Sequence, residues 1–217
     1  MLMLGVAAHA HAQSVYVNGG MALTWRQAGW RGQTPTDVKP GPEPVTTLSV
    51  GGGWWLNGTV AVEGSIEFLR AQSLSWRYTY FANRHMSTTD RDTPILGHVR
   101  FRAAQLHRIS IEPVLGGGVT RHAAQSFVLE ECATPGSPTC TTVTPPRPSP
   151  EDASWEWSVS GAMDVPIWLS TNVAVAPTAR LLFVNRRQYL TSDGFRGPDS
   201  GHGLMPSVGL QLRWTHR

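Results

Sequence analysis

Hydrophobic and polar residues alternate along much of the chain with a period of two. The stretch SWEWSVSGAMDVPIW at 154–168 shows this clearly, because its odd positions include Trp155, Trp157, Val159 and Met163, while most of its even positions are small or acidic. Successive side chains of a strand point to opposite faces, so the stretch predicts a two-faced β-strand. In a soluble sandwich the apolar face would line a core, whereas in a membrane barrel it would face lipid.

Seven further segments show the same alternation. Each is about 9–11 residues or longer, which is the length that a tilted strand needs to cross a bilayer. Together the segments predict eight strands, at 15–25, 47–56, 59–69, 95–104, 109–122, 154–168, 173–185 and 206–215.

The links between these strands alternate in length, with three short links and four long ones. A soluble sandwich offers no reason for such alternation, whereas an outer-membrane barrel has short periplasmic turns and longer external loops. We therefore predict an all-β fold, an eight-stranded antiparallel up-and-down transmembrane β-barrel. The short links are 56–58, 105–108 and 170–172, and the long links, rich in Pro, Asp, Ser and Thr, cover 26–45, 70–93, 128–152 and 190–204.

Aromatic residues gather at the strand ends. A membrane barrel carries such residues in two girdles, one at each interface, because their amphipathic rings prefer the headgroup level. The predicted girdle beside the long links consists of Trp25, Phe68, Trp155, Trp157 and Tyr189, and the girdle beside the short links or the terminus consists of Trp54, Trp55, Trp168 and Trp214.

Charged residues on the polar faces have both signs, and none of the cations is Lys. Arg suits enclosed bidentate pairs, and the interior of an eight-stranded barrel is just wide enough to be filled by side chains. We therefore predict that the polar faces point into the lumen and that glycines at 51, 53, 116 and 118 make room for long side chains. The predicted structural charge network is Glu63, Glu67, His98, Arg100, Arg102, Glu112, Glu156, Asp164, Arg180 and Arg213.

On these features the chain resembles the small eight-stranded outer-membrane barrels of the outer-membrane protein A and outer-membrane protein X type, including the porin-like outer membrane protein β-barrel domain group. The segment EPVLGGGV at 112–119 is similar to the Pro-aromatic-Gly-x-Gly-x-Gly strand of that group, with Val114 in place of the aromatic residue. The chain departs from the group after Trp214, where three non-aromatic residues follow. The resemblance implies a bacterial outer-membrane location with periplasmic termini, contact with outer-membrane lipid, and handling by the barrel-assembly machinery during biogenesis.

Residues 1–12, MLMLGVAAHAHA, combine a short apolar run with a small-x-small pattern and predict a signal peptide before a barrel domain at 13–217. A basic n-region is missing, which indicates a truncated or misassigned start; disordered leading residues are the alternative. The net charge of +3 comes from scattered residues, and no Lys/Arg run predicts a nucleic-acid partner. Cys132 and Cys140, close together in an exported chain, predict one disulfide.

Catalytic, metal and cofactor sites are not predicted. His122 and Ser126 share a strand face with Glu156 on a neighbouring strand, but positions four apart in a strand are separated by about 13 Å. No two inward His residues occupy adjacent strand positions, so no metal site is expected, and no cofactor motif is present.

The sequence therefore predicts a non-enzymatic barrel with a plugged polar lumen, and a structural or adhesion-type role through its long loops. These loops are the expected contacts for an extracellular protein or surface ligand. A lipid-modifying barrel enzyme and a small passive pore are the alternatives. Within the second long link, Trp76, Tyr78 and Tyr80 alternate with polar residues. The favoured interpretation is a loop that folds over the barrel mouth. The alternative is a protruding strand whose edge recruits a partner.

Overall fold

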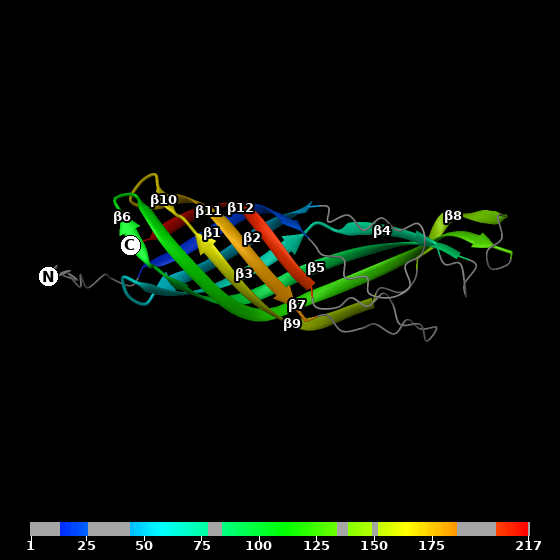
Figure 1. Cartoon of the computed structure of the whole chain (residues 1–217), viewed down its shortest axis with the longest axis horizontal. Coiled ribbons are helices and arrows are strands. Elements are labelled where there is room, and N and C mark those ends of the chain that lie inside the picture. The colour runs from blue at the N-terminus through cyan, green and yellow to red at the C-terminus, as the bar shows by residue number, and fades with distance from the viewer. Residues whose placement is uncertain are drawn as a thin grey trace.

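The computed structural model describes residues 14–25, 44–77, 84–133, 139–148, 152–185 and 203–216. Eight strands form the wall of a barrel (Figure 1). The predicted signal peptide and Tyr189 lie outside the described residues. The wall strands are β1 (Val15–Trp25), β2 (Pro44–Trp55), β3 (Val60–Leu69), β5 (Arg84–Phe101), β7 (Ile109–Cys132), β9 (Asp152–Asp164), β11 (Val173–Val184) and β12 (Gly203–His216).

Each wall strand pairs antiparallel with the next wall strand along the chain, and the last pairs with the first. In that closing pair, Val15 lies opposite His216 and Thr24 lies opposite Ser207. The wall therefore has no free edge, and the predicted eight-stranded antiparallel barrel is confirmed. Several boundaries differ from the predicted ones, and the strand predicted at 154–168 stops at Asp164, because Pro166 has no N–H for the ladder.

The three predicted short links all lie at one end of the barrel, here called the turn end, together with the start of β1 and the close of β12. Two very short strands complete this end, namely β6 (Ala104–Leu106), which pairs with β7, and β10 (Ile167–Trp168), which pairs with β7 and β11. The backbone of His107 adopts a positive φ of 51° in the tight turn that leads into β7. The opposite end is called the loop end.

The apolar face of the wall points outward. Val17 and Leu210 are 51% and 57% exposed, whereas Glu112 and Arg213 on the polar face are both 0% exposed. This arrangement is the reverse of a soluble sandwich and is the one that a bilayer requires of a barrel wall. No helix among the described residues is long and apolar enough to span a membrane.

Two of the four predicted long loops contain strands instead. β5 and β7 have 18 and 24 residues, compared with 11 in β1, and they continue past the loop end. β4 (Gln72–Arg77) pairs with this part of β5, and β8 (Cys140–Pro148) pairs with the matching part of β7. The result, the protruding sheet, consists of β4, residues 84–90, residues 125–132 and β8, and extends away from the barrel (Figure 1).

The described parts of the long links predicted at 70–93 and 128–152 therefore contain strands, most of which the sequence pattern did not predict. Trp76 lies in β4, opposite Met86 of β5, so the protruding strand, which was the less favoured interpretation, is the one found for residues 75–77. Tyr78 and Tyr80 lie outside the described residues.

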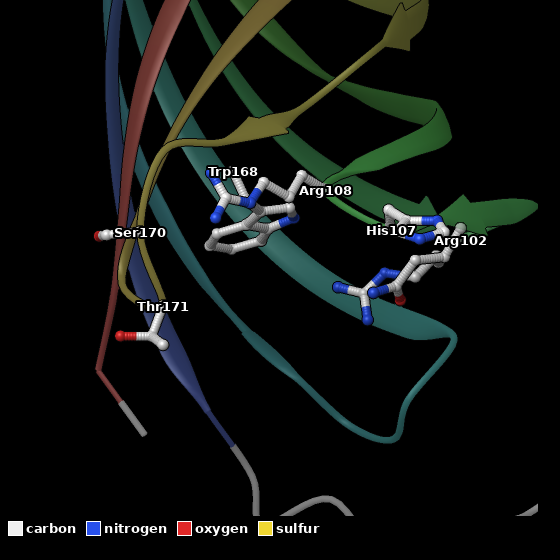
Figure 2. Close-up of a pocket in the computed structure, with 7 residues that line it drawn as sticks. Arg102, His107, Arg108, Trp168, Ser170 and Thr171 are labelled. Atoms are coloured by element: carbon white, nitrogen blue, oxygen red, sulfur yellow. The ribbon is translucent and has the colours of Figure 1, made fainter.

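The aromatic residues divide between the outer wall and the interior. Two residues predicted for the girdles lie on the inner side instead: Trp55 is buried beside Tyr16, and Trp168 lines an open cavity at the turn end (Figure 2). Both side chains point into the barrel, because the residue before each of them points outward and successive strand residues face opposite sides. The residues on the outer wall are Trp54, Phe68, Trp155, Trp157 and Trp214, all about half exposed, with Trp25 partly exposed at the end of β1.

Candidate functional site

Arg100 lies at the centre of the lumen near the turn end and contacts three carboxylates. Its guanidinium donates to Glu63 Oε2 at 2.7 Å, to Asp164 Oδ2 at 2.5 Å and to Glu112 Oε2 at 3.3 Å. All four side chains are at most 2% exposed. Because these residues come from β3, β5, β7 and β9, a single cation connects four wall strands.

Two more arginines complete this cluster. Arg213 on β12 donates to Glu112 Oε2 at 2.6 Å and lies 3.5 Å from Asp164 Oδ2. Arg102 donates to Glu112 Oε1 at 3.4 Å, and its guanidinium stacks over the ring of Trp55 at 4.0 Å. The cluster, here called the ionic layer, consists of Glu63, Arg100, Arg102, Glu112, Asp164 and Arg213.

The ionic layer holds three carboxylates and three guanidiniums, so its formal charges balance. Neutral groups supply further hydrogen bonds: the Tyr16 hydroxyl donates to Glu63 Oε2 at 2.8 Å, and the Asn18 amide donates to Glu63 Oε1 at 3.0 Å. Buried charges are tolerated when they are paired and hydrogen-bonded in this way. The layer fills the lumen at this level with interlocked side chains.

The remaining members of the predicted network lie nearer the loop end. Glu67 forms an ion pair with Arg180 across the lumen, and His98 Nε2 shares a hydrogen bond with Ser160 Oγ at 3.1 Å. Glu156 is buried too, and its carboxylate accepts a hydrogen bond from its strand neighbour Ser154 at 3.0 Å. The ten residues predicted as one charge network therefore form the ionic layer of six residues and, nearer the loop end, separate contacts made by the other four.

A second, apolar group of side chains fills the lumen toward the loop end. The six residues are all buried and come from both sides of the barrel, on β2, β3, β5, β11 and β12. The sequence pattern did not reveal them, because several lie next to an outward apolar residue, and two consecutive apolar residues give no alternation from which the inward one could be recognised. This inner apolar cluster consists of Val45, Leu69, Leu96, Leu182, Val184 and Met205.

Glycines on the inner face leave space that these layers occupy. A Cβ at Gly116 would overlap the ring of His98, and a Cβ at Gly51 would lie 2.7 Å from Asn18 Oδ1. At Gly53 it would lie 2.9 Å from the Tyr16 hydroxyl and would also overlap the β3 backbone. Any side chain at these positions would displace the groups that hold the lumen closed.

The register places His122 opposite Ser154 and Glu156 opposite Thr120, so the His and Glu considered for catalysis occupy offset positions on β7 and β9. His122 Nδ1 bonds Asp92 Oδ1 at 2.7 Å, a partner that the sequence did not indicate, because it depends on the register between β5 and β7. Ser126 lies four residues further along the same strand, and Glu156 contacts Ser154. Among the described residues, no group of three His, Cys, Asp or Glu is placed to hold a metal ion.

The two outer edges of the protruding sheet differ in chemistry. β8 contains Pro145, Pro146 and Pro148, which have no N–H to offer a further strand. β4, QSLSWR, contains no proline, and within the described residues its only strand partner is β5. Proline is a common device against unwanted strand pairing, so one edge is blocked and the other retains its backbone donors.

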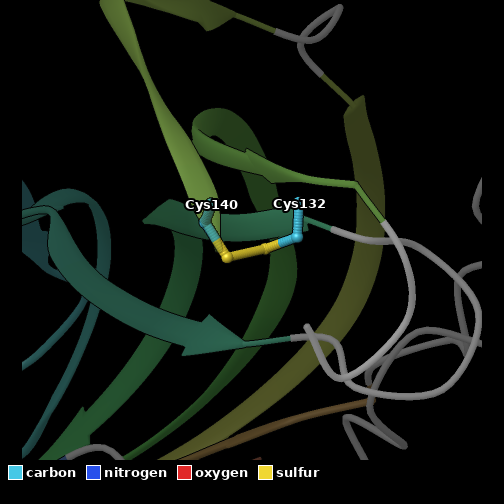
Figure 3. The surroundings of a disulfide bond; sticks show 2 residues. All are labelled: Cys132 and Cys140. Carbon is cyan, nitrogen blue, oxygen red and sulfur yellow. A yellow bond between two sulfur atoms is a disulfide. The ribbon is translucent and has the colours of Figure 1, made fainter. Parts of the chain in front are cut away.

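A disulfide joins β7 and β8 at the far part of the protruding sheet. Cys132 and Cys140 lie opposite each other in the strand pair and are bonded, as predicted (Figure 3). Nearby, the exposed side chains of Arg147 and Glu131 form an ion pair at 3.4 Å. The blocked edge is thus also covalently fixed.

Replacing both cysteines with serine is expected to loosen the protruding sheet and leave the barrel intact. A bridge across eight residues stabilises by about 2.5 kcal/mol in the chain-entropy model, and here the effect is local to β7 and β8. Limited proteolysis should cut the variant faster near residues 132–140, while its heat-dependent gel mobility stays that of a folded barrel. Alkylation of free thiols in the folded wild type would contradict the bond itself.

Comparisons with known proteins agree with this architecture. No family model matches the chain, and no curated protein matches its sequence. Among solved structures, the attachment invasion locus protein Ail of Yersinia pestis is 7% identical, with 95% of this chain and 100% of that chain covered and a TM-score of 0.50. A major outer membrane protein from Thermus thermophilus is 12% identical, with 94% and 100% covered and a TM-score of 0.52.

At such identities the similarity shows the fold. The chain has the fold of the small eight-stranded outer-membrane β-barrels, which supports an outer-membrane location. Barrels of this class serve varied roles, so the role of this chain is argued from its own features.

Proposed function

We propose that this protein is a non-enzymatic outer-membrane barrel with a sealed lumen that presents the protruding sheet to a binding partner outside the cell. In this proposal residues 1–12 direct export, the assembly machinery inserts the barrel, the turn end faces the periplasm and the loop end faces outward. The supporting observation is the protruding sheet itself, in which β5 and β7 continue well past the other wall strands. A barrel that only filled the membrane would not need this extension.

The open edge of β4 supports strand addition as the binding mode. An extended polypeptide that pairs with an exposed strand gains main-chain hydrogen bonds without requiring a deep pocket. The edge at β4 has a backbone N–H at all six positions, and the disulfide and the prolines stabilise and block the opposite edge. The partner would therefore be an extended segment of another protein.

Peptide display offers a test of this mode. Random peptides selected on the folded protein are expected to slow amide exchange at residues 72–77 and leave residues 140–148 unchanged. Leu74→Pro and Ser75→Pro are made separately, because successive N–H groups of a strand point to opposite sides. One of the two substitutions therefore removes an N–H donor from the open edge of β4, and that variant should not bind the peptides. Thr141→Pro on β8 is the control. Peptides that protect other segments, or that bind both proline variants, would argue against β4.

The sealed lumen predicts that the protein does not conduct ions. Charged and apolar layers fill the interior at two levels, so no continuous water path is expected. Wild-type protein in planar bilayers should show no steady single-channel current under conditions in which a reference porin conducts. Reproducible conductance that scales with the amount of folded barrel would favour the passive pore instead.

A further inference from the structure

The turn end contains a cavity that the proposed surface role does not use. It has a volume of about 410 Å³ and opens at the end of the barrel, between the turn that leads into β7 and the turn that leads into β11 (Figure 2). Trp168 N donates to the Arg108 carbonyl at 2.7 Å, which holds these two turns together. The cavity is lined by Arg102, Gln105, His107, Arg108, Trp168, Ser170 and Thr171.

The lining is rich in hydrogen-bond donors and, within the described residues, contains no carboxylate. Two guanidiniums, an indole N–H, an amide and two hydroxyls surround the space, and His107 adds an imidazole. Arg102 is already neutralised, because it belongs to the ionic layer, in which three acids balance three arginines. Arg108 makes no hydrogen bond or ion pair through its guanidinium in the part of the chain that the structure describes, so its charge is uncompensated.

The level of the cavity relative to the membrane indicates which anion is available to bind there. Trp54 and Trp214 lie on the outer wall near the same end, and indole side chains of membrane proteins lie at the level of the lipid headgroups. The phosphate group is the anion that a bilayer presents at this level, and guanidinium forks match its oxygens. The volume is within the range of about 300–1,000 Å³ for ligand pockets and leaves room for the organic part of an ester.

We propose that the turn-end cavity binds the phosphate group of a phosphate ester, with Arg108 as its main contact and Trp168 and Gln105 as further donors. The ester is supplied either by a membrane lipid headgroup or by a soluble molecule, since the recognising chemistry is the same. Binding here is independent of the protruding sheet, which lies at the opposite end of the barrel (Figure 1).

Indole NMR of the full chain tests this proposal. Protein folded in octyl glucoside, a detergent without phosphate, is titrated with glycerol 3-phosphate and separately with phosphatidylglycerol, with sodium chloride at matched ionic strength as the control. The indole N–H signal of Trp168, assigned with Trp168→Phe, should shift saturably with a phosphate ester and stay unchanged with chloride. Arg108→Ala should weaken binding by about ten-fold or more, because it removes a charge-assisted contact.

Arg91→Ala is the matched control, because it removes an exposed arginine from β5 near the loop end. It should change the affinity by less than about two-fold, since charges that far apart are screened. A saturable shift of the Trp168 signal with the lipid, with the soluble ester or with both supports the proposal. A shift with only one of them also identifies that molecule as the source of the phosphate group. No saturable shift with either ester, or equal affinity in Arg108→Ala and the wild type when both show folded gel mobility, would overturn it.

Discussion

Arg100→Ala is expected to lower the free energy of unfolding by about 3–5 kcal/mol, the cost typical of removing one partner from a buried ion pair. The large effect follows from its position, since its guanidinium contacts Glu63, Glu112 and Asp164 and is 1% exposed. Without it, three enclosed carboxylates share the two remaining arginines of the ionic layer. Urea unfolding in lipid vesicles, followed by tryptophan fluorescence, measures the change.

The controls separate loss of the buried charge from loss of an arginine in general. Arg91→Ala, at an exposed position of the same strand, should stay within about 0.5 kcal/mol of the wild type. Adding Glu63→Gln to Arg100→Ala should cost less than the sum of the two single changes, because each removes the partner of the other. Additive effects, or an Arg100→Ala barrel as stable as Arg91→Ala, would show that the ionic layer does not stabilise the fold.

Gly53→Ala is expected to lower the free energy of unfolding by about 1–3 kcal/mol, as overpacking a close contact does. The new methyl group would overlap the Val62 carbonyl and lie 2.9 Å from Glu63 Cα, so the β3 backbone would have to move. It would also press on the Tyr16 hydroxyl, which donates to Glu63. The same unfolding assay reports the loss.

Gly64→Ala provides the matched comparison on the neighbouring strand. A Cβ at Gly64 meets nothing within 4 Å, because that position faces outward. The substitution should be neutral or stabilise by about 0.4–1 kcal/mol, since alanine restricts the unfolded chain. Equal destabilisation by both substitutions would mean that a strand glycine matters here for its backbone freedom and not for the space it leaves.

The wall of the barrel could be predicted from sequence because two different surroundings, lipid and lumen, act on alternate residues of each strand. The prediction weakens where that contrast ends. Toward the loop end, lipid no longer favours apolar side chains on the outer face, so the segment STTDRDT at 87–93 shows no alternation of apolar and polar residues although it lies within β5. For this reason the sequence predicted mostly loop where the protruding sheet is found.

The interior was harder to predict than the wall, because it depends on which strands lie opposite one another. The run RLLFV at 180–184 is apolar at both parities, so it did not reveal that Leu182 and Val184 belong to the inner apolar cluster. Asp92 could not be assigned to His122 without the register of β5 on β7. The inward parity of Trp55 could have been inferred from its neighbour Trp54, since consecutive strand residues cannot share a face.

The ionic layer is electrically neutral only when the last strand of the barrel is in place. Glu63, Glu112 and Asp164 are all present once β9 has formed, whereas Arg213 belongs to the final strand, β12. A nascent sheet without that strand carries an excess negative charge on the face that will become enclosed. Docking of the final strand against the first brings Arg213 to Glu112 and Asp164, so the ionic layer becomes electrically balanced only when the seam is closed.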